Sequence, residues 1–219
     1  MPRLLFEKKG NAVWISHLDL MRLFQRAFKR AGLCLSHTQG FNPRPSVSIA
    51  LPLSVGVESH CELLDFDLDG ESPGCNEILE RLNDVLVDGV RILDVYSCDR
   101  KVKEIALLDC GIDLAYDSEI PDDGAEQLKA LFSNDTLIVE KHGKNGVTQQ
   151  DIIPLIRKLD VTAVDRHILH LSARICCQNP ALNPAQMVAA IDKYLPDMKP
   201  DYFRVRRYEI FDLNENVFR

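Results

Sequence analysis

The stretch SHLDLMRLFQRAFKRAG, residues 16–32, decides the fold of the first half of the chain. Ser16 and Asp19 stand three residues apart, which is the spacing of a capping motif at the start of a helix. Gly32 is typical of the residue that follows a helix, because glycine adopts a left-handed backbone conformation without strain. The stretch therefore predicts a helix that begins at Ser16 and ends near Ala31.

The side chains of this helix divide into two faces at about 100° per residue. The apolar face is formed by Leu20, Phe24, Ala27, Phe28 and Ala31. The opposite stripe is formed by Arg22, Arg26, Lys29 and Arg30. A charged stripe is usually a solvated helix face, but a row of cations can also contact successive phosphates of a nucleic acid. We therefore take the stripe as a candidate RNA-binding surface.

Strand patterns surround this helix on both sides. Strands are expected at residues 3–8, 46–53, 60–69 and 90–97, a short extended piece at 13–15, and a second helix at 74–87. The order strand, helix, strand, strand, helix, strand is that of a ferredoxin-like βαββαβ unit.

The second half follows the same pattern. Strands are expected at residues 105–116, 136–141, 166–175 and 203–211, helices at 122–132 and 184–194, and an extra helix at 148–158. Asn183 before Pro184 predicts an N-cap followed by proline at the first helical position. The sequence thus predicts an α+β fold of two tandem ferredoxin-like units, residues 1–99 and 100–219. No linker rich in glycine or proline joins them, so we expect the units to pack together.

Charge is distributed unevenly along a chain whose formal net charge is -7. Residues 1–50 contain eight Lys and Arg against two acidic residues, whereas residues 51–99 contain two Arg against twelve Asp and Glu. A basic segment on an acidic protein is a possible footprint for a polyanion. The same segment can instead form ion pairs with the acidic residues that follow it, and composition does not separate the two.

The loop after the first helix has an unusual composition. Its residues are Gly40, Phe41, Asn42, Pro43, Arg44 and Pro45. The prolines hold the residues before them in extended geometry, and Gly40 can adopt a positive φ. A stiff loop that presents Phe41, Asn42 and Arg44 can stack on an unpaired base and hydrogen-bond to it. The sequence therefore adds this loop to the candidate RNA-binding surface, with Gly40, Pro43 and Pro45 as positioning residues.

His17 is expected at the first helical position. An imidazole there can act as a general base or bind a ligand, although a histidine in such a place is more often a packed residue of the cap. Ser16 and Asp19 would position this junction. Near the C-terminus, Arg204 and Arg206 are expected on one face of a strand and form a second basic strip together with Arg207.

Other ligand classes find little support in the sequence. Asp65, Asp67 and Asp69 alternate along one strand face, where a solvated surface is favoured over a metal site. The seven cysteines show no CxxC or CxxxCxxC spacing, so we expect no metal and no cofactor. No apolar run reaches the roughly 18 residues of a membrane span, and we expect a cytoplasmic protein without a membrane partner.

A group of residues near the N-terminus carries a family resemblance. They are Phe6, Gly10, residues 15–19, Arg22, Arg26, residues 30–32, 40–43, Pro45, 51–53, Gly56 and Ser59. Together they resemble the radical SAM-linked proteins, an uncharacterised family that occurs fused to radical SAM proteins or encoded beside them. Because the CxxxCxxC motif is missing, the chain is similar to the stand-alone partner. The resemblance implies a radical SAM protein as partner and no established activity.

Three hypotheses follow. The first is a non-catalytic RNA-binding or substrate-presenting partner of a radical SAM enzyme that acts on tRNA or rRNA. The second is a metal-independent endoribonuclease with His17 as general base, because the tandem outline also resembles the CRISPR repeat-processing endonucleases. The third is a protein-interaction adaptor whose basic helix docks on an acidic partner without RNA.

Overall fold

The computed structural model describes residues 2–143 and 146–219. Over these residues the fold is α+β, as the sequence predicts, with mainly antiparallel strands and four α-helices, one fewer than predicted. The chain divides into two compact units: the first extends to Val102 and includes Arg219, and the second is Lys103–Phe218. Among the described residues, no helix has the length and apolar character that crossing a membrane requires.

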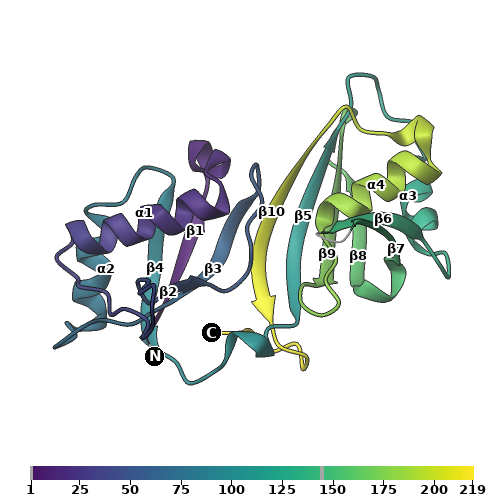
Figure 1. Ribbon diagram of the computed structural model, residues 1–219. Helices are drawn as coiled ribbons and strands as arrows, with labels where there is room; N and C mark the ends of the chain where they lie inside the picture. The colour runs from purple at the N-terminus through teal and green to yellow at the C-terminus, as the bar shows by residue number, and fades with distance from the viewer. Residues whose placement is uncertain (1, 144–145) are drawn as a thin grey trace. The chain divides into compact units, whose positions relative to one another are not determined.

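The first unit contains four strands and two α-helices within its described residues. They are β1 (Pro2–Lys8), α1 (His17–Arg30), β2 (Val47–Ile49), β3 (Glu58–Phe66), α2 (Cys75–Asn83) and β4 (Val90–Ser97). The strand order is β4-β1-β3-β2, and each neighbouring pair is antiparallel (Figure 1). The helices thus follow the first and the third strand of the unit.

Helix α1 is held on this sheet by its apolar face. Leu20, Phe24 and Phe28 are all fully buried. The ring centroids of Phe6 on β1 and Phe24 lie 4.8 Å apart in an edge-to-face arrangement, and those of Phe28 and Phe66 on β3 lie 5.0 Å apart. These contacts fix the rotation of α1 about its axis, so its polar stripe must face outward.

The second unit repeats this order of elements with one insertion. Its elements are β5 (Leu107–Ala115), α3 (Gly124–Phe132), β6 (Ile138–Gly143), β7 (Gly146–Asp151), β8 (Ile156–Ala163), β9 (Ile168–Cys176), α4 (Pro184–Tyr194) and β10 (Tyr202–Phe211). The antiparallel strand order β10-β5-β9-β8 corresponds to that of the first unit, and the hairpin β6–β7 is inserted before β8. As predicted, Asn183 caps α4 and Pro184 is its first residue.

The helix expected at residues 148–158 is wrong. These residues form β7, a short 3-10 helix at Ile153–Leu155 and the start of β8. Asp151 holds the turn between these strands: its carboxylate accepts hydrogen bonds from the backbone N–H of Leu137, at 2.9 Å, and of Ile153, at 3.2 Å. Pro154 has no N–H to donate within a helix, so the segment forms one tight turn between two strands.

Three elements of the first unit differ from prediction. Residues 13–15 do not form a strand, because a 3-10 helix runs over Gly10–Trp14 and the buried Lys8 ammonium donates to the carbonyl of Ile15, at 2.9 Å. The strand predicted at 46–53 is limited to β2. Helix α2 ends at Asn83, four residues early, because the Asn83 amide exchanges two hydrogen bonds with the backbone of Ile92.

Candidate nucleic-acid interface

A compact hydrogen-bond cluster starts helix α1. The Ser16 hydroxyl accepts from the Asp19 N–H at 3.2 Å and donates to the Asp19 carboxylate at 2.7 Å. Arg22 donates to the other carboxylate oxygen at 2.9 Å. The Ser16 hydrogen bond, followed by that of Arg22, holds the pKa of Asp19 below its usual value. The two residues therefore fix the first turn and orient Arg22.

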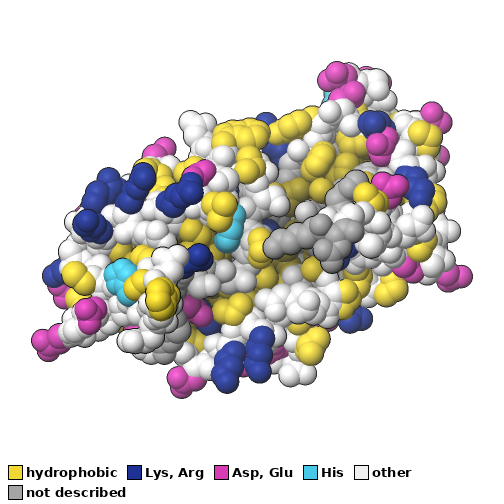
Figure 2. All heavy atoms as spheres, viewed as in Figure 1, with side chains coloured by type: hydrophobic (Ala, Val, Ile, Leu, Met, Phe, Trp, Pro, Cys, Tyr) yellow, Lys and Arg dark blue, Asp and Glu magenta, His cyan; other side chains and the backbone are white. Residues whose placement is uncertain are grey.

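The basic stripe lies on the solvent side of α1, where dark blue side chains gather along the helix (Figure 2). Arg22, Arg26, Lys29 and Arg30 are all exposed. Arg22 forms its ion pair within the helix, with Asp19, and the Arg30 guanidinium donates to the carbonyl of Val85. Within residues 2–143 and 146–219, no carboxylate lies within 4.0 Å of the charged groups of Arg26 and Lys29.

The acidic segment that follows in sequence, residues 51–99, pairs its carboxylates elsewhere. Asp65 on β3 forms a two-pronged ion pair with Arg3 on β1, at 2.6 and 3.1 Å. Glu77 pairs with Arg81 one turn later on α2. Over the described part of the chain, no carboxylate of residues 51–99 pairs with the stripe. Its positive charge is therefore available to a ligand.

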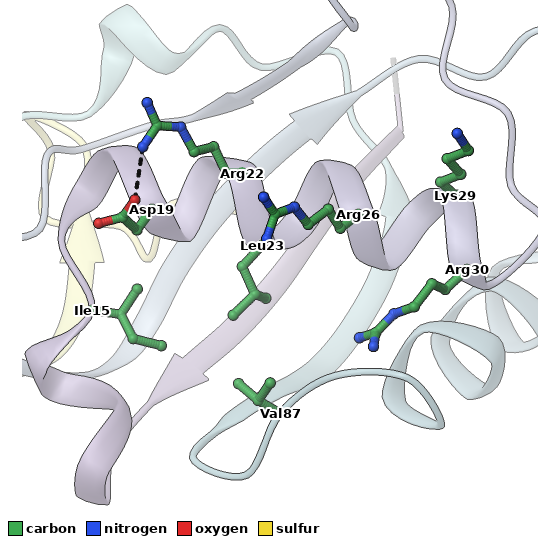
Figure 3. Close-up of a pocket in the computed structure, with 8 residues that line it drawn as sticks. All are labelled: Ile15, Asp19, Arg22, Leu23, Arg26, Lys29, Arg30 and Val87. Carbon is green, nitrogen blue, oxygen red and sulfur yellow. Dashed lines mark hydrogen bonds and ion pairs between the residues drawn. The ribbon is translucent and has the colours of Figure 1, made fainter.

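The stripe borders an open groove of about 850 Å³ (Figure 3). Its lining consists of Ile15, Asp19, Arg22, Leu23, Arg26, Lys29, Arg30 and Val87. In Figure 3, Ile15 and Leu23 lie between α1 and the loop that carries Val87, Arg30 points toward that loop, and Lys29 points to the opposite side. Four cations, one carboxylate and three apolar side chains, which we call its floor, thus line the groove. Such a groove can hold phosphates at its rim and an apolar or aromatic group at its base.

The three apolar residues of the floor were missed by the sequence analysis. Leu23 is half-buried and lies between the two faces of α1, and the available signal in the sequence was an apolar residue beside the charged stripe. Val87, which is 42% exposed, comes from the loop between α2 and β4. Nothing in the local sequence indicates that this loop lies beside α1.

The loop predicted to bind a base is a separate feature. The N–H of Thr38 donates to the carbonyl of Arg44 at 2.9 Å, and the N–H of Arg44 donates to the Thr38 hydroxyl at 3.0 Å. Gly40 has a φ of +142°, which glycine adopts readily. Asn42 is exposed, and the Phe41 ring is fully exposed to solvent. None of the loop residues lines the groove of α1.

His17 is the first residue of α1, as predicted. Its Nδ1 is buried and has no hydrogen-bond partner among the described residues. Among residues 2–143 and 146–219, no side chain of a second catalytic group is hydrogen-bonded to this imidazole. Its role as a base stays a prediction.

Comparison with solved structures gives a fold likeness at low sequence identity. No curated protein matches the chain. A chain in the crystal structure of a Cbf5-Nop10-Gar1 complex is similar at 8% identity and a TM-score of 0.54, over 95% of this chain and 48% of that one. A chain of the archaeal box H/ACA sRNP Nop10-Cbf5 complex gives 8% identity and a TM-score of 0.48, over 94% and 46%. The present chain thus spans about half the length of these two chains.

One family model covers most of the sequence. Residues 2–184 match the model of an uncharacterised protein conserved in bacteria, DUF2344. This match includes both helices of the first unit, and with them the whole groove of α1. The chain therefore belongs to the DUF2344 family, whose members are described as uncharacterised proteins conserved in bacteria.

Proposed function

We propose that the chain binds RNA through the groove of α1 and presents it, as a non-catalytic partner, to a radical SAM enzyme in tRNA or rRNA modification. The observation that carries the proposal is the groove itself: it is lined by four exposed cations, three of them without a carboxylate partner in the described structure, and by three apolar side chains. The cations contact phosphates of the RNA, and an unstacked base packs against the apolar floor.

The residues divide into three roles in this proposal. Arg22, Arg26, Lys29 and Arg30 contact the sugar–phosphate backbone. Ser16 and Asp19 hold the first turn and with it the guanidinium of Arg22. The exposed ring of Phe41, with Asn42 and Arg44 beside it in the loop, stacks on a second base outside the groove.

The radical SAM partner is inferred from the sequence resemblance of the first sixty residues. The likeness to the Cbf5-Nop10-Gar1 chain concerns the fold alone, and the proposal does not rest on it.

We also assign each unit to the ferredoxin-like class, because both have the βαββαβ order and the strand order fourth, first, third, second.

The test is charge reversal on the stripe. Arg22→Glu, Arg26→Glu and Arg30→Glu together should weaken binding of total cellular tRNA by about a hundredfold or more at low salt. The circular dichroism spectrum should be unchanged, because these side chains are exposed. Unchanged tRNA affinity would reject the proposal. A protein that co-purifies with the chain after ribonuclease treatment, and is lost in this variant, would instead support the adaptor hypothesis.

A further inference from the structure

The second unit carries an ordered polar surface on one face of its sheet. On β5, Cys110, Ile112 and Leu114 are buried, whereas Asp109 and Asp113 alternate with them and are half-buried. The register of β9 and β10 places further polar residues on the same face as Asp113. We call this surface the His170 face; it consists of Gly111, Asp113, His170, Tyr202, Arg204, Arg206 and Tyr208.

A histidine is held in one orientation on this face. His170 on β9 lies directly opposite Asp113 on β5, and its Nδ1 lies 2.6 Å from the carboxylate. The guanidinium of Arg206 on β10 lies 3.0 Å from the other carboxylate oxygen of Asp113. An ionised carboxylate only accepts hydrogen bonds, so Nδ1 carries the hydrogen and Nε2 of the neutral ring is an acceptor. The His170 side chain remains 24% exposed.

Gly111 leaves space for the rings of His170 and Tyr208. A Cβ atom at Gly111 would lie 2.5 Å from the Tyr208 hydroxyl oxygen and 2.8 Å from Cε1 of His170. Tyr208 is the extra residue of a β-bulge between Arg207 and Glu209, which gives its side chain this position. The tyrosine hydroxyl and the imidazole therefore occupy the space that a side chain at position 111 would fill.

An arginine completes the surface. Arg204 lies opposite Asp113 in the ladder of β10 and β5, on the same face. It is exposed, and its guanidinium carbon lies 5.5 Å from the ring centroid of Tyr202. In the part of the chain that the structure describes, no carboxylate lies within ion-pair distance of Arg204. Its charge is therefore available to an anion.

We propose that the His170 face recognises a ribose 2′-hydroxyl beside a phosphate, and so makes the chain select RNA over DNA. The Nε2 of His170 accepts the hydrogen bond of the hydroxyl, the guanidinium of Arg204 contacts the phosphate, and Tyr208 contacts the sugar. Asp113 is a positioning residue that fixes the ring of His170. A ribonucleotide presents a hydroxyl donor and an oxyanion side by side, whereas DNA lacks the hydroxyl. This inference rests on the proposed RNA-binding function.

The experiment compares two oligonucleotides that differ in the 2′-hydroxyl. A 12-nucleotide RNA and the DNA of the same sequence, with deoxyuridine for uridine, are titrated with the full chain by fluorescence anisotropy. We expect the RNA to bind about tenfold tighter, the contribution of one good hydrogen bond. His170→Gln and Gly111→Ala should reduce this ratio to about one. His167→Gln, a nearby exposed histidine whose ring contacts the carbonyl of Tyr116, is the matched control.

Gly111→Ala is included as a second variant in case His170→Gln fails to fold. The atoms that its methyl group meets are the ends of two side chains, so the variant displaces the rings and keeps the ladder. A second readout is histidine ¹⁵N NMR, in which the RNA but not the DNA should shift the Nε2 resonance of His170.

The outcomes separate this inference from the proposed function. Equal affinity of the wild-type chain for RNA and DNA, or a ratio that survives in His170→Gln, would overturn the inference and leave RNA binding by α1 intact. Failure to bind either oligonucleotide would contradict both. Arg26→Ala with Lys29→Ala should lower the affinity for RNA and for DNA by the same factor, because phosphate contacts do not depend on the 2′-hydroxyl.

Discussion

Removing the two unpaired cations of α1 tests the electrostatic argument without disturbing the fold. Arg26 and Lys29 are exposed, and neither has an ion-pair partner within the described residues. Substituting both by alanine should change the free energy of unfolding by no more than about 0.5 kcal/mol, as for ordinary surface positions. Any effect on RNA binding then reports on charge in the groove.

The size of the effect follows from counterion release. Each phosphate contact on a single strand contributes about −0.7 to the slope of log K against log salt concentration. Four contacts predict a slope of about −2.8, which corresponds to a loss of about fiftyfold in affinity between 50 and 200 mM salt. Two contacts predict a slope of about −1.4 and a loss of about sevenfold over the same range.

The assay is a salt titration of RNA affinity for three proteins. The matched control is Arg81→Ala with Arg91→Ala, which removes the same charge from exposed positions of the first unit that do not line the groove. We expect the slope to fall by about half in Arg26→Ala with Lys29→Ala and to stay close to wild type in the control. Equal slopes in all three proteins, or the same decrease in both variants, would refute the reasoning.

Three further predictions concern stability and titration. Asn183→Ala should lower the free energy of unfolding by about 1 kcal/mol, because it removes the capping box of α4; chemical denaturation measures this. Arg3→Met should cost about 3 kcal/mol in the same assay, since it leaves Asp65 without its buried partner; a loss under 1 kcal/mol would contradict this. Asp19 should titrate below 3.8 in carboxyl ¹³C NMR, and Ser16→Ala should raise that midpoint. Because the pKa is lowered in the folded state, the stability contribution is present above pH 3.8 and is lost as the pH falls through the folded pKa.

The sequence predicted those elements in which local pattern and packing agree. Helix α1 is read correctly because Leu20, Phe24 and Phe28 recur at helical spacing and all three are buried in the core. Strand β4 and helix α4 have the predicted bounds for the same reason. The helix predicted at residues 148–158 was wrong, because a hydrogen bond from the Leu137 N–H to the Asp151 carboxylate and the proline at 154 outweighed a weak helical pattern.

The candidate sites show the same limit. The cationic stripe follows from the periodicity of one helix and was therefore predictable. The floor of its groove was not, because Val87 reaches it from a distant loop. The pair of His170 and Asp113 depends on the register between β9 and β5, and a shift of one residue would place them on opposite faces. No single-sequence pattern specifies that register.

Ultraviolet cross-linking in cells tests the central claim most directly. The chain is irradiated in its host, purified under denaturing conditions and digested, and peptides that carry a nucleotide are identified by mass spectrometry. The account predicts ribonucleotide adducts on α1 or on the loop around Phe41, and their loss when Arg22, Arg26 and Arg30 are changed to glutamate. Recovery of the chain without RNA adducts on the first unit would contradict it.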